Sequence, residues 1–415
     1  MDIKEIINKK SLCKKLTTNE INFFVNGYTN GEIPDYQMSA LLMAIKINGM
    51  DESETFALTR AMLNSGRITD LSNMGFCVDK HSTGGISDNT TLILAPICAS
   101  CGVKLFKLSG RGLGFTGGTV DKLESFEGFK MELSMEDATA LVKKNNACVI
   151  SASKDLAPAD KKIYALRDCT STVECLPLIA SSIMSKKLAS GADGIVLDVK
   201  YGNGAFMKTK KDALELANLM VKIGKAFGKK MDYKIGDMNQ PLGFNIGNKL
   251  EAYEAIEVLS GKKGNLRNEA LELAGKCISL SKNIPYKEAL KLATNALDSK
   301  KALEQFKVMV KSQGGSLKLF NGLDIKPKLK IESPVSGTLS KIDCVKLGTL
   351  VGEMGARRKT IDGGINYNVG VKTFHKLGDK INKGDVLFEL FADDKKLATN
   401  FKNEFLNCYT INSTL

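Results

Sequence analysis

Apolar positions along the first 65 residues recur every three or four residues, a spacing that indicates helices. Thr17 and Glu20 have the spacing of a capping box and precede the apolar positions of residues 21–25. Asp35 opens a second helical stretch, and Asp51 is placed to cap a third. No strand pattern intervenes, so we expect the chain to begin with a small all-helical module.

Near Gly75 the pattern changes to short apolar runs separated by helical stretches. The runs suited to buried strands are residues 76–78, 103–108, 147–150 and 194–199. Ser134 and Thr209 are placed to cap two of the intervening helices. Strands that alternate with helices indicate a large α/β domain with a mainly parallel central sheet. Residues 164–189 read as helical again, and we expect them to return to the first module.

After about residue 331, glycines punctuate a third series of short runs that resemble strands. These include Val335, Leu339, Ile342, Val345 and Val351, and the stretches 365–371 and 386–391. The pattern predicts a β-rich α+β domain of the barrel-sandwich type. It resembles the biotinyl carriers, although their Met-Lys-Met modification site is missing. The expected domains are helical (1–68 and 160–192), α/β (75–155 and 193–325) and C-terminal α+β (331–415).

Composition narrows the class of protein. Lys and Arg number 59 against 46 Asp and Glu, a formal net charge of +13. Because the lysines are spread along the chain and Trp is absent, we expect no nucleic-acid surface. No apolar run has the length of a membrane span, and the N-terminus has no secretory h-region. The ten cysteines are scattered, which fits a cytoplasmic protein with reduced thiols.

The first motif with chemistry, residues 79–85, follows a predicted strand and precedes a helix predicted over residues 88–99. Ligands of open α/β sheets bind at the carboxyl ends of strands, where a helix start offers free N–H groups. Lys80 adds a positive charge and Ser82 a hydroxyl, a combination that suits a phosphate dianion. An ordinary capped turn between strand and helix would look similar.

A second loop favours the phosphate interpretation. Five glycines fall within residues 110–118, again after a strand and before a helix. Each glycine costs chain entropy when it is ordered, so we expect close approach of the backbone to a ligand. Ser109 and Thr119 flank the loop as further donors. Residues 112–117 also form a G-x-G-x-x-G pattern, a weak dinucleotide signal that leaves a dinucleotide-dependent oxidoreductase open.

The run from Ser109 to Glu124 closely resembles the signature of the thymidine and pyrimidine-nucleoside phosphorylase family. The resemblance covers nearly the whole chain, and its further motifs are residues 79–85, 164–168, 181–187, 204–208 and 240–243. It implies reversible phosphorolysis of thymidine, deoxyuridine and uridine to a free base and a (deoxy)ribose 1-phosphate. The site would lie in the cleft between the helical and α/β domains.

The resemblance also implies which residues act. Phosphate, the co-substrate, would be held by Lys80, His81, Ser82, Thr91, Lys107, Leu108, Ser109 and Thr119. The nucleoside would be held by Leu113, Tyr164, Arg167, Ser182 and Lys186. His81, Arg167 and Lys186 would be catalytic, with His81 donating a proton or hydrogen bond to the leaving base. From the local sequence alone, we would instead expect Arg167 to form a salt bridge and Lys186 to lie on a solvated helix face.

Members of this family often hold a monovalent cation, K⁺ or Na⁺. The matching positions are Ser87, Asn89, Leu242, Asn245 and Glu254, of which Ser87 and Asn89 replace the usual Gly and Thr. Phe115 stands where histidine is usual. Thymidine-restricted members have methionine at the position of Lys107, so we expect uridine to be a substrate here as well.

The resemblance implies a homodimer through the helical module and no organic cofactor. A thymidine-restricted phosphorylase is the nearest alternative. An anthranilate-type phosphoribosyltransferase would need an acidic Mg²⁺–pyrophosphate site, which the matched motifs lack. A non-enzymatic β-rich carrier is a further alternative, which only the C-terminal domain supports.

Overall fold

The computed structural model describes residues 1–112, 114–151, 155–358 and 363–412. Leu113, expected at the nucleoside, therefore lies outside the described residues. The chain divides into two compact units, which are described separately. The first unit is Met1–His81, Ala152–Leu197 and Leu214–Tyr233, and the second is Ser82–Ser151, Asp198–Ala213 and Lys234–Leu415. The three-domain boundaries expected above stay a prediction.

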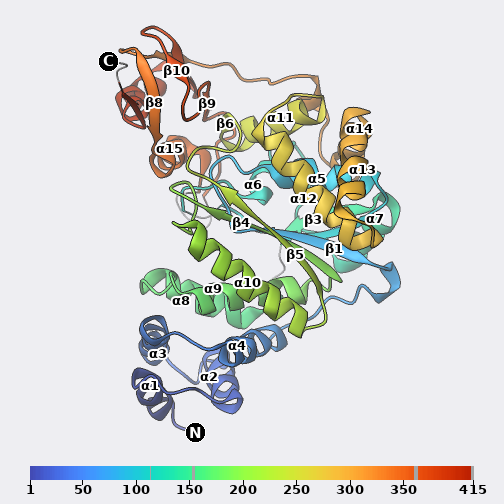
Figure 1. Ribbon diagram of the computed structural model, residues 1–415, viewed down its shortest axis with the longest axis vertical. Coiled ribbons are helices and arrows are strands. Elements are labelled where there is room, and N and C mark those ends of the chain that lie inside the picture. The colour runs from blue at the N-terminus through green and yellow to red at the C-terminus, as the bar shows by residue number, and fades with distance from the viewer. Residues whose placement is uncertain (113, 152–154, 359–362, 413–415) are drawn as a thin grey trace. The chain divides into compact units, whose positions relative to one another are not determined.

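The N-terminal helices of the first unit form the bundle at the blue end of the chain in Figure 1. The capping box predicted at Thr17 with Glu20 starts α2, and Asp51, predicted as a cap, starts α4 and forms a capping box with Glu54. The helices are α1 (Ile3–Ser11), α2 (Thr18–Asn30), α3 (Asp35–Asn48) and α4 (Glu52–Asn64), followed by the 3₁₀ turn η1 (Ser72–Met74).

Helices α8 (Pro158–Cys169) and α9 (Leu176–Ala189) return to this bundle, as the pattern predicted. Ile163 of α8 and Leu178 of α9 belong to the same buried apolar cluster as Phe24 and Leu41. The burial of these apolar stripes is what fixes α8 and α9 against the bundle.

A five-stranded sheet has the order β3-β2-β1-β4-β5. Its strands are β1 (Cys77–Ser82), β2 (Lys104–Ser109), β3 (Ala147–Ser151), β4 (Gly194–Tyr201) and β5 (Lys230–Asp237). Strands β2 and β3 pair in parallel, with Leu105 opposite Ala147. Four of the strands were predicted, whereas β5 was not. Strand β1 also continues through Ser82, so Lys80 and His81 lie in the strand and not in the loop after it.

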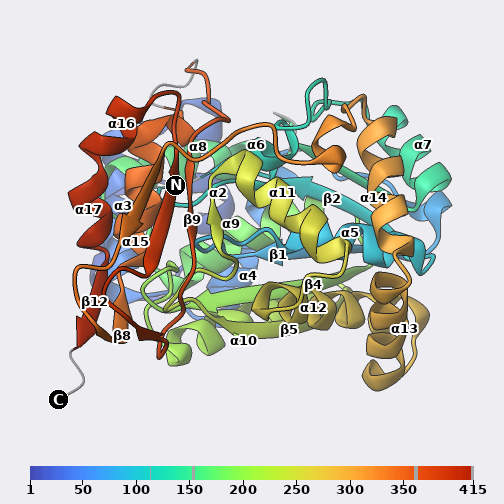
Figure 2. The same cartoon turned by 90° about the horizontal axis from the view of Figure 1, so that it is seen from above.

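Helices α5 and α7 of the second unit pack on β2 and β3, and Figure 2 shows α12 beside α13; most of α10 belongs to the first unit. Ser134 caps α7 as predicted, and Thr209 accepts the Asp212 N–H at the start of α10. The helices are α5 (Thr90–Ser100), α6 (Thr119–Leu123), α7 (Met135–Asn145), α10 (Lys210–Ala226), α11 (Asn248–Leu259), α12 (Asn265–Lys282), α13 (Tyr286–Asp298), α14 (Lys301–Ser312) and the 3₁₀ turn η2 (Lys318–Asn321). None of the described helices is long and apolar enough to span a membrane.

Residues 329–412 form the C-terminal part, which contains two small antiparallel sheets. Their strand orders are β10-β8-β12 and β6-β9-β11-β7, and β6 joins the second sheet from earlier in the chain. Their strands are β6 (Asn245–Ile246), β7 (Leu329–Glu332), β8 (Gly337–Ile342), β9 (Gly370–Thr373), β10 (Lys380–Ile381), β11 (Val386–Phe391) and β12 (Tyr409–Asn412). Three helices and a π turn accompany them: α15 (Cys344–Val351), η3 (Gly352–Ala356), α16 (Lys395–Asn400) and α17 (Lys402–Leu406).

The expectation of strands at Val345 and Val351 was wrong, because both residues lie in helix α15. Asp343 caps this helix by accepting the N–H of Lys346. Gly348 stands inside the helix and interrupts its pattern, which explains why the run resembled a strand. Val335 also lies in a bend, and of the stretch 365–371 only Gly370 and Val371 lie in a strand. Leu339, Ile342 and the stretch 386–391 lie in strands as predicted.

Candidate functional site

Ser82 ends strand β1 and leads into a turn organised by one carboxylate. The Ser82 hydroxyl donates to Asp88 Oδ2 at 2.5 Å and accepts the Gly84 N–H at 3.1 Å. Thr90 Oγ1 donates to the other oxygen of Asp88 at 2.6 Å. Gly84 has φ +88°, a conformation that a side chain would strain. Asp88, which the sequence did not single out, therefore fixes the turn that presents Ser82.

The glycine-rich loop, residues 110–118, is built around Asp121 and Glu124. Arg111 Nη1 donates to Asp121 at 2.9 Å and to Glu124 at 2.6 Å, and the Gly112 N–H donates to Asp121 at 2.6 Å. The Glu124 hydrogen bond raises the pKa of Arg111, so this guanidinium holds the loop as a permanent cation. A Cβ at Gly118 would lie 2.2 Å from the main chain of Arg111, which excludes any side chain there.

Lys122 connects the two loops. Its ammonium donates to the Asp88 carbonyl at 2.7 Å and pairs with Glu251 Oε2 at 2.6 Å, and both side chains are almost fully buried. Gly84 also approaches Thr116, since a Cβ there would lie 4.0 Å from its Oγ1. The structure thus brings the Ser82 turn and the glycine-rich loop together, as the prediction of a shared anion site requires.

Ser109 offers an unused hydroxyl at the end of β2. Its Oγ is buried and has no hydrogen-bond partner among the residues that the structure describes. Native proteins satisfy nearly all buried polar atoms, so such an atom calls for a ligand or a water molecule. Among the other residues expected at phosphate in this unit, Thr91, Lys107 and Leu108 are buried and Thr119 is the first residue of α6.

Lys80 and His81 belong to the part of β1 in the first unit. The strand is anchored there by Asp79, which accepts the Lys80 N–H at 2.7 Å and pairs with Lys187 Nζ of α9 at 2.8 Å. Lys187 and Asp79 are both nearly inaccessible to solvent. Removal of one partner from such a buried pair is strongly destabilising, so the pair fixes β1 against α9.

The residues expected at the nucleoside lie on α8 and α9. Lys186 Nζ donates to Ser182 Oγ at 3.0 Å, one helical turn away, and to Asp160 Oδ2. Asp160 is buried, and its other oxygen has no hydrogen-bond partner among the described residues. Sequence reasoning missed Asp160, because nothing in the local pattern links it to a lysine 26 residues away. Lys186 is therefore held by an ion pair and does not extend from a solvated face.

Arg167 is bound by main-chain carbonyls, and no acidic side chain among the described residues pairs with it. Its guanidinium donates to Val173 O at 2.8 Å, Leu178 O at 3.1 Å and Thr172 O at 3.2 Å. Burial lowers the pKa of Arg167, and its guanidinium lies 5.7 Å from the Tyr164 ring centre. Burial also raises the pKa of the Tyr164 phenol. Three of the five guanidinium N–H donors are used, which leaves two for a ligand.

The positions expected at a monovalent cation contain unused oxygens. The amide oxygens of Asn89 and Asn245 are buried and have no hydrogen-bond partner among the described residues, while both amide nitrogens donate to α11 carbonyls. Glu254 accepts the Asn245 N–H at 3.1 Å, and the Ser87 hydroxyl donates to the Asn245 carbonyl at 2.7 Å. Buried carboxylate and amide oxygens are suitable ligands for a hard cation, so the residues fit. Leu242 lies in the loop just before Asn245.

Comparisons with known proteins identify the family. The a/b-domain model of the glycosyl transferase family matches residues 75–303, and its helical-bundle model matches residues 4–66. The chain belongs to this glycosyl transferase family. Residues 75–303, which the a/b-domain model matches, include every described position named above for phosphate, nucleoside and cation. Residues 338–412 match the model of the pyrimidine nucleoside phosphorylase C-terminal domain.

Curated relatives of this family match along almost the whole chain. The pyrimidine-nucleoside phosphorylase of Staphylococcus haemolyticus is 47% identical over 95% of this chain and 92% of its own length. The enzyme of the same name from Bacillus subtilis is 48% identical with the same coverage. Anthranilate phosphoribosyltransferase from Thermus thermophilus has the same fold, with a TM-score of 0.59, 19% identity, and 74% of this chain and 99% of that chain covered.

Proposed function

We propose that the protein is a pyrimidine-nucleoside phosphorylase, a pentosyltransferase. It reacts thymidine, deoxyuridine or uridine reversibly with phosphate to give a free base and a (deoxy)ribose 1-phosphate. The observation that carries the proposal is the similarity to pyrimidine-nucleoside phosphorylases at 47–48% identity over 95% of the chain. The unused Ser109 hydroxyl, next to a glycine-rich loop, supports phosphate as the second substrate.

In this proposal phosphate is the nucleophile. Lys80 supplies positive charge, and the hydroxyls of Ser82, Thr91, Ser109 and Thr119 donate hydrogen bonds that hold one phosphate oxygen toward the anomeric carbon. Lys107 and Leu108 line the phosphate from β2. As the bond to the base breaks, the sugar gains oxocarbenium character and the base gains negative charge. Binding contributes to rate only where it favours that charge distribution.

The proposed nucleoside residues stabilise the leaving base. Lys186, fixed by Ser182 and Asp160, directs its remaining N–H at a base carbonyl, and Arg167 donates with its two unused N–H groups. Tyr164 provides a ring surface beside Arg167. His81 donates a proton or hydrogen bond to the base as it departs. Leu113, the remaining residue of this proposal, lies outside the described residues.

We further propose that K⁺ or Na⁺ binds at Ser87, Asn89, Leu242, Asn245 and Glu254. When bound, the cation would supply a second positive charge beside the buried Glu254 carboxylate, which already pairs with Lys262 Nζ at 3.4 Å. The unused amide oxygens of Asn89 and Asn245 support this proposal. Of these residues, Ser87 and Asn89 take the place of the Gly and Thr expected from the family pattern.

A homodimer through α3 is also proposed. Tyr36, Ala40, Met43 and Ile47 of α3 are all exposed and recur at spacings of four, three and four residues, the spacing of a helix-packing seam. Tyr36 is 74% exposed and Ile47 73%, which is unusual for large apolar side chains aligned on one helix. A second copy of the chain that presents the same seam would bury them symmetrically. The cytoplasm is the proposed compartment.

Release of free base with and without phosphate tests the proposed activity. The purified chain is incubated with uridine, thymidine or cytidine, and free base is measured by liquid chromatography. We expect phosphate-dependent release from uridine and thymidine. Release that does not depend on phosphate would indicate a hydrolase, and release from thymidine alone would favour the thymidine-restricted alternative and refute the role given to Lys107.

A further inference from the structure

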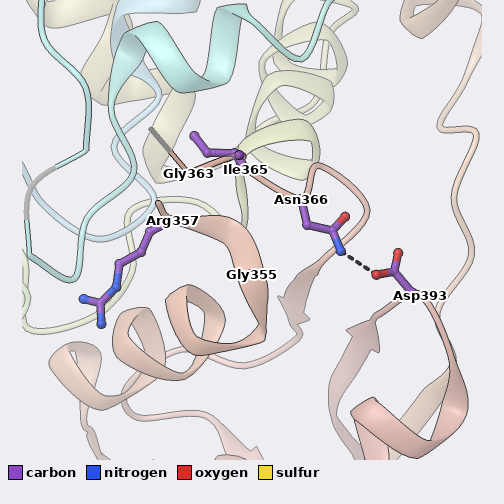
Figure 3. A pocket seen from close by; sticks show the side chains of 7 residues that line it. Gly355, Arg357, Gly363, Ile365, Asn366 and Asp393 are labelled. Carbon is purple, nitrogen blue, oxygen red and sulfur yellow. Dashed lines mark hydrogen bonds between the residues drawn. The ribbon is translucent and has the colours of Figure 1, made fainter. Parts of the chain in front are cut away.

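The C-terminal part of the second unit contacts the glycine-rich loop through a charged side chain. Arg357 Nη1 donates to the Gly114 carbonyl at 3.0 Å. Figure 3 shows the Arg357 side chain extending away from the hydrogen-bonded pair Asn366 and Asp393, with which it lines a cavity of about 660 Å³. The guanidinium therefore binds the loop and not Asn366 or Asp393, the polar pair that lines the cavity.

A second contact from the C-terminal part involves the loop's own acidic anchor. Tyr367 OH donates to Glu124 Oε2 at 3.5 Å, the same carboxylate oxygen that accepts from Arg111. Burial and then the charge of Glu124 raise the pKa of Tyr367 to about 12, so the phenol stays protonated and remains a donor. Arg111 and Tyr367 thus both donate to Glu124 Oε2.

A third contact is apolar and lies at Phe115, next to Gly114. Phe115 packs on the buried cluster of the C-terminal part, and its ring lies 5.9 Å from that of Phe206. A Cβ at Gly348 of α15 would lie 2.2 Å from the Phe115 carbonyl, so the two main chains are in direct contact. The aromatic ring in the usual position of histidine is therefore an anchor for the loop tip.

The segment that carries Arg357 is itself fixed. Asn248, the first residue of α11, donates from Nδ2 to the Ala356 carbonyl at 2.8 Å. Arg357 therefore extends from a main chain that is tied to the α/β fold next to the loop. Arg357 itself is exposed, so the hydrogen bond of the preceding residue to α11 is what restricts the position from which its guanidinium reaches Gly114.

We infer that Arg357, with Phe115 and Tyr367, holds the glycine-rich loop in the conformation that binds phosphate. The C-terminal part therefore contributes to the phosphate site. The inference rests on the proposed function. Five glycines in nine residues lose much chain entropy when the loop is ordered on a ligand. Contacts that order the loop beforehand reduce that loss on binding and so raise phosphate affinity.

Substitution of Arg357 separates phosphate binding from nucleoside binding. Arg357→Met keeps the aliphatic stem and removes the donors, so we expect the phosphate KM to rise about 3- to 10-fold. The uridine KM is expected to rise much less than the phosphate KM, since four of the five residues proposed to hold the nucleoside lie on α8 and α9 and only Leu113 lies in the loop. Arg357→Lys keeps one charged donor and should restore part of the loss. Lys380→Met removes one exposed lysine elsewhere in the C-terminal part and should change neither KM.

Calorimetric titration with inorganic phosphate is the readout that does not require turnover. Wild type is expected to bind phosphate, and Arg357→Met and Tyr367→Phe to bind it more weakly while their thermal midpoints stay near that of wild type. The inference is overturned if both variants bind phosphate as wild type does, or if the uridine KM rises as much as the phosphate KM. A wild type that neither binds phosphate nor releases base would instead overturn the proposed function.

Discussion

Replacement of Ser109 by alanine is expected to make the ligand-free protein more stable while it weakens phosphate binding. A purely structural serine would not show these opposite effects. The Ser109 hydroxyl is buried at the end of β2 and has no hydrogen-bond partner among the described residues. Alanine removes that hydroxyl and leaves the strand and its pairing with β3 unchanged.

The magnitudes follow from what the hydroxyl does in each state. A buried polar group without a partner costs about 1–3 kcal/mol, so Ser109→Ala is expected to raise the free energy of unfolding without phosphate by about 1 kcal/mol. A hydrogen bond to a charged phosphate contributes about 1.5–3 kcal/mol, which corresponds to about 10- to 150-fold in phosphate affinity.

Urea denaturation without phosphate and the phosphate KM are the two measurements. Ser190→Ala is the matched control, because the Ser190 hydroxyl is fully buried but donates to the Lys187 carbonyl at 2.7 Å. That variant should lose about 1 kcal/mol of stability and keep the wild-type phosphate KM. The reasoning is refuted if Ser109→Ala is destabilised and its phosphate KM is unchanged, since Ser109 would then behave as the control does.

Three further changes test other parts of the structure. Asn89→Ala should abolish a K⁺-dependent rise in thermal midpoint, measured against tetramethylammonium at equal ionic strength; a rise that persists would contradict the cation proposal. Ile47→Glu should convert a dimer into a monomer in light scattering, and an unchanged mass would rule out the α3 interface. Burial lowers the pKa of Lys376 from 10.5 to about 8, so the unfolded chain binds more protons between these values. The stability of wild type relative to Lys376→Met should therefore rise by up to about 3 kcal/mol from about pH 7.5 to 10.5, whereas a constant difference would disprove the shift.

Local signals in the sequence predicted much of the fold. The capping boxes at Thr17 and Asp51 involve residues three apart, so they are visible without tertiary structure. Strand β5 was missed because most of its side chains are only partly buried and several are charged, a pattern that does not resemble a core strand. Helix α15 was missed because Gly348 interrupts it and its apolar residues also fit a strand.

The candidate site was only partly predictable, for a related reason. Glycines and hydroxyl residues cluster along the chain, so the phosphate loops could be found. The carboxylates that fix site residues are invisible to local patterns when they are distant in sequence, as Asp160 is from Lys186. Arg357 reaches Gly114 across 243 residues, a contact that only the folded chain reveals.

Phosphorus NMR of a reaction with uridine tests the central claim most directly. As uracil accumulates, we expect the inorganic phosphate signal to fall and a sugar-phosphate ester signal to grow, with one ester formed for each uracil released. Addition of uracil and ribose 1-phosphate alone should regenerate uridine and phosphate. Uracil release with a constant phosphate signal and free ribose as the product would contradict the account.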